Sequence, residues 1–307
     1  MNVREWALPV YTILIQLGAG MLLVLWLVRG AAVRRLGGAE IDRVFIRPVM
    51  VVFFTLLAGA LGAHFHLSNP ALSFLAVLNF GHSWLSREVV FTVLALLSCA
   101  ALVDQFTRGE RANPALKTGL GWVTIGAGFL AIYCMSQIYL LPTQAPWNHW
   151  TTVFLFLASA LLMGIPSAAA LLTMEMIFTN QSGPPLSGAH LAVLRRSFVW
   201  LARLAGVVFG LVGLLSLAQI LSTTQGSGLA QVSASLLLDL YQPLLWLRFI
   251  VLLVGITIFS LVAYWLDANR RDLQSLVAPV YLACLLVLMG EILGRFLFYA
   301  THVRLGI

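Results

Sequence analysis

Residues 66–88, HLSNPALSFLAVLNFGHSWLSRE, form the one long stretch of this chain that gathers polar side chains between hydrophobic segments. The segments on either side, 45–64 and 88–106, are largely apolar and each is about long enough to span a bilayer. The stretch therefore marks a membrane boundary. Its polar residues include His66, Ser86, Arg87 and Glu88.

The composition of the whole chain agrees with this assignment. Hydrophobic residues make up 61% of the 307 residues and charged residues only 9%, whereas soluble domains carry about 25% charged residues. So few charges cannot cover the surface of a soluble fold, so the chain is expected to be an integral membrane protein. The net charge of +7 reflects arginines in the connections between apolar segments, so we expect lipid and no nucleic acid as a partner.

Eight apolar segments have the length of about 20 residues that a spanning helix needs. We therefore predict an all-α integral membrane protein with eight transmembrane helices in a single polytopic membrane domain, residues 1–307. The expected helices are 8–28, 45–64, 88–106, 119–141, 150–173, 198–220, 244–266 and 276–300.

The basic residues predict the orientation of these helices. Counting along the chain, 13 of the 18 basic residues lie in or beside the first, third, fifth and seventh connections. Basic residues favour the cytoplasmic side of a membrane. We therefore expect the odd-numbered connections to be cytoplasmic and both termini to lie on the outer side.

Two outer connections, 66–87 and 221–243, are longer than the others and mix polar with apolar residues. They are too polar to span a membrane. Their sequences predict short amphipathic helices at the outer surface, or a docking platform for a partner.

The last segment, 276–300, and the residues after it carry Glu291, Arg295, Tyr299 and His302. Their spacing of four, four and three residues places them on one helix face. Ionisable residues inside a membrane are costly, so this face should point into the bundle. Two interpretations stand: a structural ion pair between Glu291 and Arg295, or a contribution of Arg295 to a binding site.

His66 and Glu88 end and begin neighbouring segments, so both are expected at the outer interface. Oxidation of a quinol releases two protons, which a histidine and a carboxylate can accept and relay. We therefore expect His66 and Glu88 to be the catalytic pair, with Ser86 and Arg87 beside them. Tyr139 near the outer end of 119–141 is a further candidate, although interfacial tyrosines are common without a function.

The three cysteines, Cys99, Cys134 and Cys284, lie singly in apolar segments, without the spacing of an iron–sulfur or c-type haem motif. No two histidines fall at matched depth inside the membrane, as a b-type haem requires. We therefore expect this chain to bind no metal, haem or iron–sulfur cluster.

Three stretches resemble the membrane anchor subunit of bacterial dimethyl sulfoxide reductase, a member of the polysulfide-reductase type of eight-helix quinone-reactive anchors. The first is WALPVYTILIQLGAG at 6–20. The second is HLSNPALSFLAVLNFGHSWLSREV at 66–89, which is similar to the family pattern H-L-x-x-P…S-x-L-N…S-x-L-S-x-E. The third is GEILGRFLFYATHVRLG at 290–306, which is similar to the closing G-E-L-I-G-R…F-Y-x-x-H segment.

The resemblance implies a role for the protein in anaerobic respiration, in the bacterial cytoplasmic (inner) membrane with both termini periplasmic. It implies that His66 and Glu88 bind menaquinol, and that no haem or iron–sulfur cluster is held by this chain. It further implies two partners on the periplasmic side, a ferredoxin-like subunit with four iron–sulfur clusters and a molybdopterin catalytic subunit. The protein is then the menaquinol-oxidising anchor of that complex and completes no reaction alone.

Two other functions remain open from the residues. One is a secondary transporter whose path is lined by the Glu291–Arg295 face, although the two halves show no internal repeat. The other is a purely structural anchor without a quinone site of its own. The sequence names neither the terminal substrate of the complex nor the quinone species.

Overall fold

A computed structural model describes residues 3–36, 38–64, 70–182, 188–226, 228–268 and 273–302. Within these ranges, eight helices are long and apolar enough to cross a membrane, and each overlaps one of the expected spanning segments. The predicted class, an all-α multi-pass membrane protein, is therefore confirmed.

The eight long helices are, in chain order, α1 (Val3–Leu36), α3 (Ile46–His64), α4 (Trp84–Thr107), α5 (Pro114–Ile138), α6 (Trp150–Ser182), α7 (Gly188–Gln225), α9 (Gln242–Asp267) and α10 (Leu273–Ala300). Short elements lie between them: α2 (Ala39–Asp42), the 3₁₀ helices η1 (Arg43–Phe45), η2 (Pro70–Asn79) and η3 (Gly109–Arg111), α8 (Leu229–Ser235) and the π-helical turn η4 (Leu236–Leu240).

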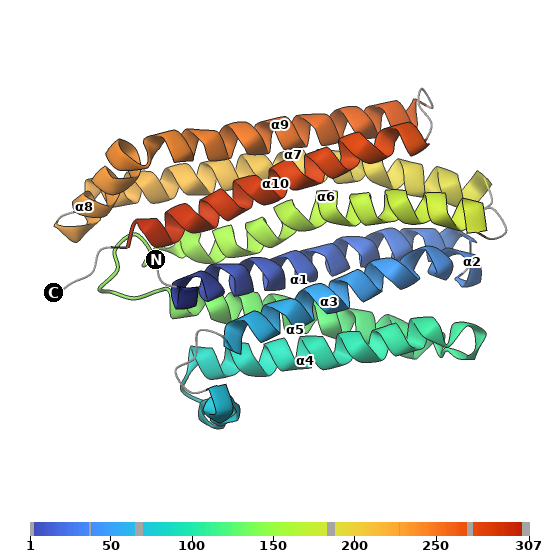
Figure 1. Cartoon of the computed structure of the whole chain (residues 1–307), viewed down its shortest axis with the longest axis horizontal. Coiled ribbons are helices and arrows are strands. Elements are labelled where there is room, and N and C mark those ends of the chain that lie inside the picture. The colour runs from blue at the N-terminus through green and yellow to red at the C-terminus, as the bar shows by residue number, and fades with distance from the viewer. Residues whose placement is uncertain are drawn as a thin grey trace.

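The long helices run side by side, with α1 and α6 in the middle of the bundle (Figure 1). Helices α7, α9 and α10 lie on one side of this pair, and α3, α4 and α5 lie on the other. The most apolar windows of α1 and α6 are 67% and 78% buried, against 50% or less in the other six spanning helices. The core therefore follows the α1–α6 contact, and the outer helices face lipid.

Two glycines allow α1 and α6 to touch through their backbones. A Cβ atom on Gly20 would lie 1.8 Å from the carbonyl oxygen of Ala160, and one on Gly164 would lie 2.3 Å from the carbonyl carbon of Gly20. Small residues permit such close approach, which is how helices gain packing energy inside a membrane. The contact fixes how the two halves of the bundle meet.

The two ends of the bundle differ. One end of the bundle contains the start of α1, the end of α10, and the short helices η2 and α8, and we call it the terminal end (Figure 1). Helix α2 and the α4–α5 connection lie at the opposite end. The expected helices in 66–87 and 221–243 are thus present, as η2 in the first connection and as α8 with η4 in the second.

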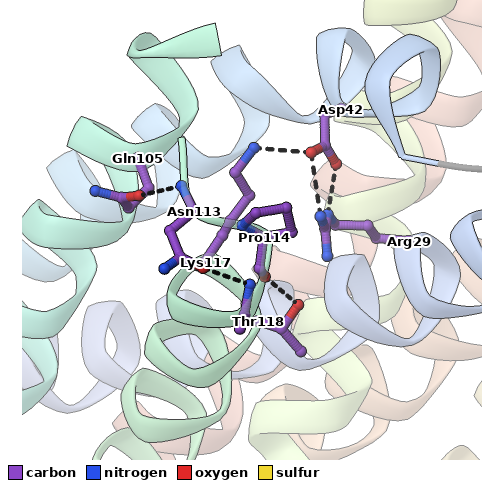
Figure 2. A network of polar contacts seen from close by, with 8 residues as sticks. Arg29, Asp42, Gln105, Asn113, Pro114, Lys117 and Thr118 are labelled. Carbon is purple, nitrogen blue, oxygen red and sulfur yellow. Dashed lines mark hydrogen bonds and ion pairs between the residues drawn. The ribbon is translucent and has the colours of Figure 1, made fainter. Parts of the chain in front are cut away.

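A buried ionic network ties α1, α2 and α5 together at the opposite end (Figure 2). The Asp42 carboxylate accepts hydrogen bonds from Arg29 Nε at 2.7 Å and Nη2 at 3.1 Å, and from Lys117 Nζ at 2.8 Å. The side chains of Arg29 and Lys117 are each only 7% exposed. Two basic residues that the sequence analysis counted only as orientation signals therefore hold the connection after α1 in place.

Candidate functional site

Glu88, the carboxylate predicted to accept protons, lies in the first turns of α4 at the terminal end and is only 3% exposed. Its carboxylate accepts a hydrogen bond from the Tyr11 hydroxyl of α1. The hydroxyl oxygens of Tyr11 and Thr92 are 3.1 Å apart. Among the described residues, no basic side chain lies within ion-pair distance of Glu88. A buried carboxylate with neutral hydroxyl partners is suited to taking up a proton, because protonation removes its buried charge.

The residues before Glu88 shape the start of α4. Ser83 caps the helix by accepting a hydrogen bond from the Ser86 N–H at 3.3 Å, and Ser86 is itself buried. Arg87 donates to the carbonyl oxygens of Phe80 at 3.0 Å and of Gly81 at 2.6 Å. Arg87 therefore holds the turn in front of the helix, while Ser86 is buried in the same turn of α4 as Glu88.

Tyr139 and Tyr299 lie farther along the same end of the bundle, and their hydroxyl groups are hydrogen-bonded to each other. Tyr299 also shares a hydrogen bond with Thr12, the neighbour of Tyr11 on α1. Both tyrosines interact electrostatically with Glu88. Tyr139, predicted as a candidate at the outer end of α5, thus belongs to the buried hydroxyl groups around Glu88.

Arg295 is buried one helical turn deeper than Tyr299, and its partners come from other helices. Its Nη2 donates to the Gln16 side-chain oxygen of α1 at 2.6 Å, and Gln16 donates to the Phe156 carbonyl of α6 at 2.8 Å. The guanidinium also lies over the Phe156 ring, 3.9 Å from its centroid. Arg295 therefore joins α10 to the central helix pair.

Glu291 also takes its direct partners from other helices. It accepts a hydrogen bond from Ser159 of α6, and its Oε1 is 3.6 Å from Arg248 Nη2 of α9. Arg295 acts on Glu291 electrostatically without a direct ion pair within 4 Å. The sequence spacing had suggested Arg295 as the ion-pair partner of Glu291. Instead, α6 and α9 pack against α10 and bring Ser159 and Arg248 into contact with this carboxylate. Arg248 and Ser159 were not foreseen from the sequence.

An aromatic cap closes this end between α5, α6 and α10. The Trp147 indole donates to the Phe298 carbonyl at 2.7 Å and stacks on His302, with ring centroids 4.9 Å apart. Burial lowers the pKa of the neighbouring His149, so this imidazole stays neutral near pH 7, and its Nδ1 accepts from the Thr151 N–H at 3.4 Å. Trp147 and Phe298 also pack against the rings of Tyr139 and Tyr299.

His66, the other predicted catalytic residue, lies outside the described residues. Among the residues that the structure does describe, no group of three or more His, Cys, Asp or Glu side chains could hold a metal ion. Tyr11 and Thr92 are the site residues that sequence reasoning missed. The only signal was a tyrosine near the start of the first spanning segment, and tyrosine near a helix end is ordinary in membrane proteins.

Comparison with known proteins gives matches over nearly the whole chain. The family model described as DMSO reductase anchor subunit (DmsC) matches residues 1–301. The protein is 27% identical to the anaerobic dimethyl sulfoxide reductase chain YnfH of Escherichia coli over 99% of its own length and 96% of that protein. It is 26% identical to a second anaerobic dimethyl sulfoxide reductase chain of the same organism, with the same coverage. It is also 31% identical to a sulfite dehydrogenase subunit of Allochromatium vinosum, over 47% of its own length and 49% of that protein.

Proposed function

The chain belongs to the family of dimethyl sulfoxide reductase anchor subunits, and on this premise we propose that it is the menaquinol-oxidising subunit of a molybdopterin reductase complex. The quinol binds at the terminal end of the bundle, beside Glu88 and His66. Its electrons pass to a docked iron–sulfur subunit with four clusters and from there to the molybdopterin subunit.

The burial of Glu88 carries this proposal. The carboxylate is only 3% exposed and lies within a spanning helix, with the hydroxyl of Tyr11 as its hydrogen-bond donor. Ionisable groups in membrane segments are costly and mark sites of proton transfer. Glu88 lies in the first turns of α4, at the terminal end, so the path of a released proton to water is short.

Each quinol loses two electrons and two protons and becomes the quinone. The electrons go to the iron–sulfur partner, and the two hydroxyl protons go to the Glu88 carboxylate and the His66 imidazole, which pass them to water. Tyr11 orients the carboxylate through its hydrogen bond, and Ser86 and Arg87 fix the helix start that carries Glu88.

The partner subunits dock at the terminal end, because electron transfer needs the quinol and an iron–sulfur cluster to be close. Both long connections, with η2 and α8, lie at this end (Figure 1). With the odd-numbered connections in the cytoplasm, as the basic residues predict, this end is periplasmic. The sulfite dehydrogenase relative supports a general anchor role, with the terminal substrate set by the catalytic partner.

Replacement of Glu88 by Gln tests the proposal, since glutamine keeps the size and hydrogen bonding of the side chain but cannot accept the proton. Quinol-dependent turnover of the assembled complex should fall about 100-fold. Turnover with a soluble one-electron donor that bypasses the quinol should not change. The matched control is Glu175→Gln, which alters a similarly buried carboxylate on α6 that pairs with Arg47 at 3.2 Å. Equal quinol turnover in the two variants would exclude Glu88 from the reaction.

His66→Leu should lower quinol turnover in the same way and should also weaken the binding of a quinone analogue, because it removes a hydrogen-bond partner of the head group. Activity with the soluble donor should remain. If both His66→Leu and Glu88→Gln keep full quinol turnover, the terminal end is a docking platform without a quinone site.

A further inference from the structure

A second polar region lies among α6, α7, α8, α9 and α10, apart from Glu88. It is a cavity of about 100 Å³, lined by Phe156, Gln219, Arg248, Glu291, Arg295 and Phe298 among other residues. Its walls also include Pro146, Thr223 and Thr301, which lie near the terminal end. The cavity therefore runs from that end toward the charged groups of α9 and α10.

Four of the residues that line this cavity each carry a buried polar atom without a hydrogen-bond partner. These atoms are Ser216 Oγ, Ser233 Oγ, Arg248 Nε and Glu291 Oε1. They come from four different helices, α7, α8, α9 and α10. Inside a membrane protein, lipid offers no hydrogen bonds, so such groups must be satisfied by protein, water or a ligand.

Gly294 helps to make this arrangement. A Cβ atom at this position would lie 2.5 Å from Arg248 Nε and 2.6 Å from Arg248 Cζ. The guanidinium of Arg248 therefore lies across α10 in the space left by the glycine and reaches Glu291 on the same helix. Its Nη2 lies 3.6 Å from Glu291 Oε1, while its Nε has no hydrogen-bond acceptor.

The donor and acceptor capacity of these four atoms limits which molecule can occupy the cavity. The guanidinium can only donate, the carboxylate can only accept, and the two serine hydroxyls can do either. An anion would meet the Glu291 carboxylate, and a cation would meet the guanidinium groups of Arg248 and Arg295. A neutral molecule that both donates and accepts fits all four. Water does both and is the smallest such molecule, so it can approach polar atoms that the protein covers almost completely.

We propose that this cavity is a water-filled inlet, through which water from the terminal end reaches the cluster of Arg248, Glu291 and Arg295. Glu291 lies nine residues before Ala300, the last residue of α10, so the inlet reaches about 14 Å into the bundle at 1.5 Å per residue. The water completes the hydrogen bonds of the charged cluster. The inference is independent of the quinol site, since none of its four atoms belongs to the groups around Glu88.

Cysteine substitution in the complete complex tests the inlet. Ser216→Cys and Ser233→Cys replace two of the lining hydroxyls by thiols. A small maleimide modifies a thiol only where water allows the thiolate to form and where the reagent itself can enter and reach the sulfur. The matched control is Ser98→Cys. Ser98 is as buried as Ser216, at 7% and 6% exposed, but its hydroxyl is hydrogen-bonded to Thr124 and to the α4 backbone.

Both cavity thiols should react on the order of tenfold or more faster than the control, with and without a quinone analogue. Reaction of both at the rate of Ser98→Cys would overturn the inlet. Protection of both by the analogue would overturn it too, because the occupant would then be a quinone. A loss of quinol turnover in Glu88→Gln has no bearing on these rates, so this test and the test of the proposed function can fail separately.

Discussion

The buried charged side chains of this protein take their partners from other helices. Asp42 is shared by Arg29 and Lys117, and Glu291 is held by Ser159 and Arg248. Removing one member of a buried charged group is costly because the other charges lose their partner. These contacts should therefore dominate the response of the protein to single substitutions.

Asp42→Asn should destabilise the protein strongly, because it leaves Arg29 and Lys117 buried without a counter-charge (Figure 2). We expect the free energy of unfolding to fall by about 3 kcal/mol, measured by denaturant unfolding of the purified protein in detergent. This value is at the lower end of the cost of removing one member of a buried ion pair, because the Asp42 side chain is still 16% exposed.

Asp104→Asn is the matched control. Asp104 forms an ion pair with Arg108 at the same 2.7 Å, but the two side chains are 49% and 57% exposed. Exposed pairs contribute less than about 1 kcal/mol. A loss for Asp104→Asn as large as that for Asp42→Asn would contradict the assignment of Asp42 as the centre of a buried network.

The sequence specified part of this picture. It placed Glu291 and Arg295 on the face of the last helix that points into the bundle, and it identified Glu88 as a carboxylate near a membrane boundary. It could not supply Arg248, Gln16 or Tyr11 as partners, because those pairings depend on how helices distant in sequence pack.

At the scale of helices, hydropathy predicted which segments are helical but not where they end. The expected start of the third helix was residue 88, whereas α4 begins at Trp84 because Ser83 caps it. The expected end of the sixth helix was residue 220, whereas α7 continues to Gln225. There the hydroxyls of Ser222, Thr223 and Thr224 bond to backbone carbonyls three or four residues earlier. The Ser83 cap explains the earlier start of α4, and the polar last turn of α7 lies outside a window chosen by hydropathy.

The crossing of α1 and α6 gives a prediction at this scale. Gly20→Ala should prevent the two helices from packing, because the new methyl group would lie 1.8 Å from the Ala160 carbonyl oxygen and a backbone atom cannot move away cheaply. We expect a loss of about 3 kcal/mol or more in the free energy of unfolding and a lower midpoint of thermal unfolding.

Gly206→Ala on α7 is the control for this substitution, since nothing lies within 4 Å of the added Cβ atom. Alanine favours helix over glycine by about 1 kcal/mol, so stability should stay the same or rise. If Gly20→Ala is tolerated equally well, the two helices do not depend on backbone contact.

At the scale of the whole molecule, the two ends of the bundle carry different groups. The terminal end, where α4 begins and α10 ends (Figure 1), holds Glu88, the tyrosine pair and the cavity. The opposite end, with α2, holds the Asp42 network. Eight spanning helices place the start of α1 and the end of α10 at the same end. The orientation, with this end in the periplasm, stays a prediction from the basic residues.

The most direct measurement of the central claim is a structure of the complete complex, in a lipid environment, with a quinol analogue bound. We predict the head group at the terminal end, with one of its oxygens at a hydrogen-bond distance of about 2.7 Å from the Glu88 carboxylate. The iron–sulfur partner should lie beside the same end. A head group bound at the opposite end, or in the cavity beside Arg248 and Glu291, would contradict the assignment of Glu88 as the group that receives the quinol proton.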